Sequence, residues 1–418
     1  MPAWRPFISK ALRDAFRPAF IPSPWVRPPN RPQAPADACP ADEIVALAHC
    51  PVCGHTARTI VCPFNRFALF EQPPDEHAAL YDYALCHACG IVYATRRPGG
   101  ARFTWLYDRF EATLGRDDPD EGNPAKLALS SRRLTPEHRE HLRRLASRGV
   151  FVSEHLGLKR REYLPALFSD RIANSLHADI IGSLVPLRAP RVLEIRSRLG
   201  TISATLARLY GAECCAMAIF ESQQFLIQEV YGIPSAWPID FERFRIPFEG
   251  SFDLVIANHM LTHVLRPADF LAEVRSHLRP GGHLYLYKEM DEGMFLARSK
   301  SMFNALNAFH LQTFDSPSLV RALAAHGFAT EFITPNDDGT YICLARMQDR
   351  PGEWTRMPDR ERTRRETAYR QAYDAAVIRM PEHARWQVAG DWDAVVRRAI
   401  ESGMATLTKN GQVKPRRK

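Results

Sequence analysis

The stretch RVLEIRSRLGTISATL, residues 191–206, changes its apolar pattern half-way along. Residues 191–195 form a short apolar run with one acid, which is typical of a buried strand. Residues 201–206 begin the pattern of an amphipathic helix, and Gly200 between the two favours a tight turn. The stretch therefore predicts a strand, a turn and a helix in immediate succession.

The same alternation continues further along the chain. Apolar runs at 213–220, 252–258 and 279–289 are separated by helix-length segments such as 268–278. Apolar strands that alternate with amphipathic helices are typical of a parallel sheet with crossover helices. We therefore expect a doubly wound α/β fold, in which ligands bind beyond the carboxyl ends of the strands.

Composition divides the 418-residue chain into five expected regions. In chain order these are a Pro/Arg-rich and unfolded start (1–40), a four-cysteine module (41–100), a helical bridge or lid (101–180), the α/β domain (181–347) and a helical C-terminal extension with a basic tail (348–418).

The net charge of +8 is concentrated at the two ends of the chain. Residues 1–36 hold six Arg or Lys against one acid, and residues 348–418 hold sixteen against ten. A surface that follows nucleic acid would place this excess on the folded body, so the charge does not favour a nucleic-acid partner. No apolar run reaches the roughly 18 residues of a membrane span, and residues 6–20 lack the apolar core of a secretory signal. We expect a cytoplasmic protein.

Four of the nine cysteines form two matched pairs, Cys50/Cys53 in CPVCG and Cys86/Cys89 in CHACG. A two-residue gap lets both thiolates face one ion, and the glycine that follows permits the tight turn around the sulfurs. Two such pairs predict a structural, tetrahedral Zn²⁺ site. The alternative is two disulfides, which the expected cytoplasmic location disfavours.

Several motifs between residues 180 and 347 resemble those of class I S-adenosylmethionine-dependent methyltransferases. They are VLEIRSRLG (192–200), AIFES (218–222), FDLVIANHMLTHV (252–264) and LRPGGHLYLY (278–287). The cysteine pairs also resemble the zinc-binding domain that precedes this fold in sugar C-methyltransferases. The resemblance implies a Rossmann-like sheet, S-adenosylmethionine and Zn²⁺ as cofactors, and a small-molecule acceptor such as a nucleotide-linked sugar or a glycan.

The cofactor turn matches the family only in part. Glu194 matches the acid that ends the first strand and Gly200 the last glycine of the turn, but Arg196 and Arg198 stand where the family has its other two glycines. Either the turn moves outward or the arginine side chains point away from the cofactor. An arginine here can also pair with an anionic group of a ligand through its planar guanidinium.

Three further residues match cofactor positions of the family. The acid that holds the ribose would fall at Phe220, so Glu221 replaces it only if the second strand ends in a bulge; otherwise Glu221 is a surface residue that opens a helix. Asp240 matches the carboxylate that accepts the adenine amino group, with a turn cap as its alternative. Asn258 matches the loop beside the amino-acid end of the cofactor.

His310 is the candidate catalytic base. It matches the histidine of the Tyr/Glu/His cluster of the sugar C-methyltransferases, while Asn307 and Phe309 stand at the other two positions. A histidine titrates near working pH and can accept a proton, or it can simply hydrogen-bond a neighbouring loop. His259 and His263 lie four apart, so on a helix that begins there they share a face.

Two classes of function remain at this point. The first is a methyltransferase that acts on a small molecule. The second is a non-catalytic protein of the same fold that binds an anionic ligand or scaffolds a complex, which explains the missing glycines more simply. The C-terminal extension is a candidate cap of the substrate cleft or contact of a homodimer.

Overall fold

The structure is a computed structural model, and it describes residues 44–62, 82–100, 103, 134–147, 176–186, 188–197, 200–290, 310–335, 340–379, 392–407 and 413–415. The start of the chain, most of the expected bridge at 101–180, and Arg198 lie outside these residues.

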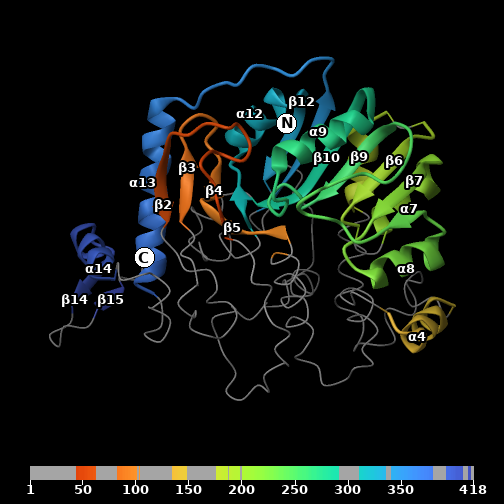
Figure 1. Cartoon of the computed structure of the whole chain (residues 1–418), viewed down its shortest axis with the longest axis horizontal. Coiled ribbons are helices and arrows are strands. Elements are labelled where there is room, and N and C mark those ends of the chain that lie inside the picture. Colours follow the sequence, from red (N-terminus) through yellow and green to blue (C-terminus); the bar gives the residue numbers. More distant parts are fainter. Residues whose placement is uncertain are drawn as a thin grey trace, which may run out of the picture.

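A seven-stranded sheet forms the centre of the chain (Figure 1). Its strands, in spatial order, are β12 (Phe328–Pro335), β13 (Thr340–Met347), β10 (Leu278–Met290), β9 (Phe252–Asn258), β6 (Arg191–Ile195), β7 (Glu213–Met217) and β8 (Ser235–Ala236). The five strands from β10 to β8 are parallel, and β13 and β12 add an antiparallel edge. The predicted α/β fold with a mostly parallel sheet is confirmed.

Helices connect the parallel strands in the order that the sequence pattern predicts. They are α7 (Thr201–Tyr210), α8 (Glu221–Tyr231) and α9 (Pro267–His277). A further helix, α12 (Ser316–Ala325), precedes the antiparallel strand β12. The central strands β6 and β9 are almost wholly buried, because helices that cover both faces of a parallel sheet leave its strands little access to water. Cys214 and Cys215 are buried residues of β7, and Cys343 is a buried residue of β13.

The cysteine module is a small antiparallel sheet that borrows a strand from the α/β region. Its order is β11 (Gln312–Thr313), β4 (Val92–Ala94), β3 (Tyr83–Cys86) and β2 (Arg58–Cys62). A short ladder of β1 (Ile44–Ala46) and β5 (Arg96–Pro98) lies beside it. In the sequence β11 lies within the α/β region, but it pairs with β4 of the cysteine module. A shared sheet therefore joins the cysteine module to the α/β region.

The C-terminal extension packs on the cysteine module. Helix α13 (Asp359–Val377) contacts β2, and α14 (Trp392–Glu401) contacts α13 (Figure 1). Tyr369, Tyr373 and Val395 from these helices share an apolar core with Tyr83 and Leu85 of β3. A hairpin of β14 (Ala405–Leu407) and β15 (Val413–Pro415) follows.

Helix α4 (Pro136–Ser147) is an amphipathic helix within the expected bridge. It contacts α8, where Arg139 and Arg143 lie over the ring of Phe225. None of the described helices combines the length and the apolar character that crossing a membrane requires.

Candidate active site

The turn after β6 keeps a shape that normally calls for glycine. Arg196 adopts a φ of 59°, in the left-handed region, and Gly200 has a φ of 72° where it precedes α7. The amide of Gly200 donates to Ser197 Oγ over 3.1 Å. A non-glycine residue at such a φ costs about 1 kcal/mol or more and persists only where its surroundings hold it.

Gly200 also lies close to the neighbouring helix. A Cβ on this residue would stand 3.1 Å from Ile227 Cγ1 and 3.3 Å from Tyr231 Cδ2, both on α8. The glycine therefore meets two demands at once, the left-handed φ and the close approach of α8.

Glu194 is buried and supports the turn from below. Its Oε2 accepts hydrogen bonds from the amide of Ser203 over 3.1 Å and from the Ser203 hydroxyl over 2.6 Å. These contacts tie the end of β6 to the first turn of α7. In the structure Glu194 thus shapes the turn.

The side chain of Arg196 points across the strand ends. Its Nη1 donates to the carbonyl of His259 over 2.9 Å, and Asn258 Nδ2 lies 3.5 Å from the Arg196 carbonyl. Of the two outcomes expected for an arginine here, the structure shows the side chain turned away from its own turn and toward β9. Asn258 Oδ1 is buried and has no hydrogen-bond partner among the described residues.

Glu221 is the first residue of α8 and faces α4. Its carboxylate accepts from the amide of Leu134 over 2.8 Å and pairs with Arg139. The register between β6 and β7 is regular through Met217, so the strand itself ends without a bulge. Asp240 is exposed, and its Oδ1 accepts from the amides of Glu242 and Arg243 over 2.8 and 2.9 Å.

Three histidines meet at the carboxyl end of β9. The ring centroids of His259, His263 and His310 are 4.6, 5.0 and 5.1 Å apart. The sequence predicted a helix for the first two, but residues 261–263 form a turn and α9 begins only at Pro267. The rings meet instead because His259 takes a φ of 52° and the chain folds back on itself. Sequence reasoning did not place His310 with this pair, since the contact joins segments 47 residues apart.

The turn that carries two of these histidines rests on a buried carboxylate. Glu289 accepts from the amide of Leu261 over 2.9 Å and from the amide and hydroxyl of Thr262 over 3.3 and 2.9 Å. Burial raises the pKa of Glu289 to about 7, although these hydrogen bonds oppose the shift. Burial, together with the nearby Arg196, lowers the pKa of His263 well below its usual value, which favours a neutral imidazole.

His310 is held by the cysteine module. The hydroxyl of Tyr83 in β3 donates to the His310 carbonyl over 3.0 Å, and the amide of Ala94 in β4 donates to the next carbonyl, that of Leu311, over 2.8 Å. The amide of Leu311 in turn donates to Thr262. Strands β3 and β4 of the module thus hold the candidate base beside the other two histidines.

The region that carries this geometry is similar in sequence to known methyltransferase domains. Residues 158–331 match the family model described as a methyltransferase domain. The match covers about two fifths of the chain and falls mostly on the α/β region.

Curated relatives are similar to parts of this chain. A ubiquinone biosynthesis O-methyltransferase of Ralstonia nicotianae is 26% identical over 164 residues, which cover 37% of this chain and 67% of that protein. One of Xanthomonas campestris is 30% identical over 118 residues, covering 27% and 48%. An uncharacterized 37.1 kDa protein in transposon TN4556 of Streptomyces fradiae is 27% identical over 213 residues, covering 50% and 61%. The chain thus spans about half to two thirds of the length of these relatives.

Among solved structures, the 1,6-didemethyltoxoflavin-N1-methyltransferase of Burkholderia thailandensis is similar with a TM-score of 0.35. The identity is 19%, over 52% of this chain and 92% of that one. A glycopeptide N-methyltransferase is similar with a TM-score of 0.33 and 18% identity, over 42% and 94%.

The four paired cysteines converge beside the α/β domain. Cys50 Sγ lies 3.6 Å from Cys89 Sγ, and Cys53 Sγ lies 3.5 Å from Cys86 Sγ, with all four sulfurs within 4.8 Å of one another. A tetrahedron of sulfurs around one ion at about 2.3 Å has edges of about 3.8 Å. The spacing fits a single four-thiolate site.

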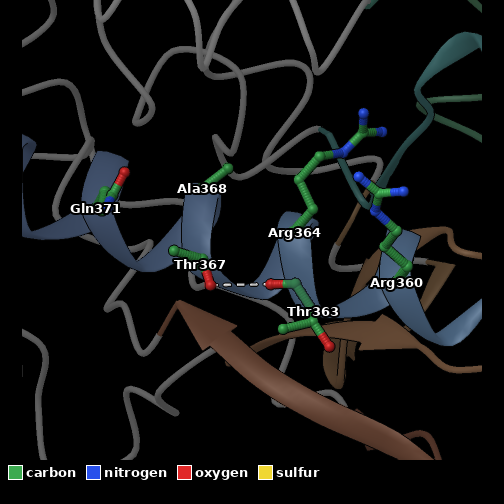
Figure 2. A pocket seen from close by; sticks show the side chains of 6 residues that line it. All are labelled: Arg360, Thr363, Arg364, Thr367, Ala368 and Gln371. Carbon is green, nitrogen blue, oxygen red and sulfur yellow. Dashed lines mark hydrogen bonds between the residues drawn. The ribbon is translucent and has the colours of Figure 1, made fainter.

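A shallow hollow of about 590 Å³ lies on the exposed side of α13. Arg360 and Arg364 project from successive turns beside it, and the Thr367 hydroxyl donates to the Thr363 carbonyl over 2.9 Å (Figure 2). Its lining holds no carboxylate and no histidine. We place no part of the active site there.

Proposed function

We propose that the chain is an enzyme that transfers a methyl group from S-adenosylmethionine to a small-molecule acceptor. The observation that carries the proposal is the turn after β6, which keeps its left-handed form at Arg196 and Gly200 in a methyltransferase domain. It opens at the carboxyl ends of β6 and β9, where ligands of parallel sheets bind.

The residues at this edge suit the amino-acid end of the cofactor. Asn258 Oδ1, buried and without a described partner, is placed to accept from an ammonium group. The guanidinium of Arg196 lies against the neighbouring carbonyl of His259, where it can pair with a carboxylate. Arg196 would then replace the close backbone approach that glycine permits with a charged contact. We propose the same for Arg198, on its position in the sequence alone.

We assign the residues that hold the adenosine end of the cofactor by their position in the sequence and by the hydrogen-bonding capacity that their carboxylates still have. Asp240 uses one oxygen for its turn, so the second is available to the adenine amino group. Glu221 would hold the ribose hydroxyls while it keeps its contacts with Leu134 and Arg139, since a carboxylate can accept about four hydrogen bonds. Helix α4 would then close over the ribose.

Bound S-adenosylmethionine supplies an activated sulfonium methyl group. The chain's own part is to align the acceptor and to exclude water, which methyl transfer mainly requires. His310, buried beside His259 and His263, is placed to take the proton of the attacking hydroxyl. With its proton removed, the acceptor oxygen would be placed to accept the methyl group.

Different observations support two classes of methyl acceptor. The paired cysteines support a nucleotide-linked sugar or glycan, through their resemblance to the sugar C-methyltransferases. The Ralstonia and Xanthomonas relatives are ubiquinone biosynthesis O-methyltransferases, which supports a hydroxyl acceptor instead. The histidine cluster is compatible with both classes, because methylation of a hydroxyl and methylation of a carbon each require that a proton leave the acceptor.

We also propose that Cys50, Cys53, Cys86 and Cys89 hold Zn²⁺. Their sulfur spacing supports one closed site, in which four thiolates leave no position for a substrate. The ion would therefore be structural, and it would stabilise the module that holds His310.

The test is calorimetric titration of the full-length protein with S-adenosylhomocysteine. We expect micromolar binding that falls at least about tenfold in Asn258→Leu, which removes the buried amide, and that is unchanged in the surface control Gln348→Leu. An acceptor panel of nucleotide sugars and ring hydroxyls then follows, read by S-adenosylhomocysteine release. If the wild-type protein fails to bind, the non-catalytic alternative replaces the enzyme.

A further inference from the structure

The three clustered histidines form a donor set of a known kind. One ligand atom from each of His259, His263 and His310 lies within 4.8 Å of the others. A tetrahedral ion bound at about 2.1 Å needs nitrogens about 3.4 Å apart. Side-chain rotations that move each nitrogen inward by about 1 Å would bring the three nitrogens to this spacing. The rings cross at 77°, 58° and 85°, which leaves their edges, where the nitrogens lie, free to converge.

We propose that these histidines bind a divalent transition-metal ion of the zinc type, separate from the cysteine site. Three imidazoles suit zinc, cobalt, nickel or iron rather than magnesium or calcium. Three protein ligands with one open position are also the arrangement of catalytic, as opposed to structural, zinc.

The backbone holds each ligand in place before any ion arrives. The amide of His259 donates to the Tyr287 carbonyl over 2.9 Å, and the amide of His263 donates to Met260 over 3.0 Å. The His310 carbonyl accepts from Tyr83 in the cysteine module. The left-handed φ of His259 is what brings its ring to the cluster, and a cost of about 1 kcal/mol for that conformation is a sign of a constrained site.

The burial of the three histidines indicates on which side of the ion the open coordination position lies. His263 and His310 are buried, whereas His259 is only partly buried. The ion would thus have two ligands in the interior and one at the edge of the cleft, with its open position toward the carboxyl ends of the strands.

The charges nearby select what fills the open position. Arg196 lies against the His259 carbonyl and adds a fixed positive charge. An ion beside this guanidinium favours an anionic fourth ligand. If the proposed function holds, that ligand is the acceptor hydroxyl, which a bound ion would ionise near neutral pH with loss of its proton to solvent. His310 would then serve as a ligand of the ion, and the role of base given to it above applies to the protein without this ion. The metal site itself does not depend on that function.

The test uses tag-free, full-length protein whose cysteine site is first filled with one equivalent of Zn²⁺. Titration with Co²⁺, followed by visible absorption, should then show one further equivalent without a thiolate charge-transfer band. His259→Gly should weaken this binding by about a hundredfold or more, since loss of a direct ligand exceeds the effect of an outer-shell change. Glycine tolerates the left-handed φ, so the variant preserves the backbone.

The control is His277→Ala, on α9 and outside the cluster. It should bind Co²⁺ as the wild type does, and His310→Ala should behave as His259→Gly does. The proposal is wrong if zinc-filled wild type takes up no Co²⁺, or if His259→Gly and His310→Ala bind it unchanged. Titration of the same samples with S-adenosylhomocysteine reports on the proposed function independently, because none of the three histidines is assigned to the cofactor.

Discussion

At the scale of single residues, two left-handed positions frame the candidate cofactor turn. Arg196 and Gly200 both have positive φ, yet only Gly200 also faces a neighbouring helix. The arginine is tolerated because its side chain has somewhere to go, toward the His259 carbonyl. The glycine has no such freedom, since any Cβ meets α8.

Gly200→Ala should therefore destabilise the protein more than Gly211→Ala. Both residues have a left-handed φ, of 72° and 64°, but a Cβ at Gly211 meets no atom within 4 Å. We expect about 1 kcal/mol for the backbone strain in each variant and about 1 kcal/mol more for crowding at Gly200. Urea unfolding measures the difference, and equal losses would show that α8 does not constrain the turn.

Glu289→Gln should also be costly, because the carboxylate serves three donors on Leu261 and Thr262. The amide group of glutamine would face one of these donors with a donor of its own. We expect a loss of about 2 kcal/mol in the free energy of unfolding. Glu331→Gln, at a more exposed ion pair with Arg346, should change it by less than about 0.5 kcal/mol. Similar values for the two variants would contradict the role given to Glu289.

At the scale of elements, β11 links the cysteine module to the active site. It pairs with β4 and follows His310 directly, so the order of the module and the position of the candidate base depend on the same hydrogen bonds. If the four cysteines hold Zn²⁺ as proposed, the shared sheet would let the ion influence the position of His310 without contacting it.

Removing zinc with a chelator should loosen β11 together with β2, β3 and β4. Amide exchange at residues 310–313 should rise with that of the module, whereas β7 in the parallel sheet should keep its protection. Hydrogen-exchange mass spectrometry makes this comparison on one sample. Faster exchange confined to residues 50–53 and 86–89 would separate the module from the active site.

Sequence predicted the elements far better than the contacts between them. The alternation of strands and helices over 191–289 was correct because apolar periodicity is a local property. The cysteine pairs came together as their spacing indicated. The helix expected at His259 and His263 was wrong, since the left-handed φ of His259 breaks it. The third histidine and the shared strand β11 could not be foreseen, because both depend on pairing between distant segments.

At the scale of the whole molecule, Arg321 joins three parts of the chain. It lies on α12 in the α/β domain, donates to the Cys89 carbonyl over 3.1 Å and pairs with Glu361 of α13 over 2.7 Å. Nearby, Arg365 of α13 pairs with Asp315, which caps α12. The described part of the C-terminal extension thus secures the cysteine module against the α/β domain.

Arg321→Ala should loosen this junction. It leaves the Cys89 carbonyl and a largely buried Glu361 without their partner, so we expect a loss of about 2 to 4 kcal/mol. Zinc transfer to a chelator should be faster as well, because the turn that carries Cys86 and Cys89 loses the hydrogen bond from Arg321 to the Cys89 carbonyl. Arg346→Ala, at an exposed pair, is the matched control and should leave both measurements near wild type. Unchanged zinc release in Arg321→Ala would contradict the junction.

The most direct test of the account is a paired titration with S-adenosylhomocysteine and 5′-methylthioadenosine, which lacks the amino-acid carboxylate. The wild-type protein should bind both, and Arg196→Gly, which keeps the left-handed turn, should lose about tenfold to a hundredfold in affinity for the first alone. That result would establish a cofactor cleft in which arginine holds the carboxylate. Absence of binding to wild type, or an equal loss for both ligands, would contradict it.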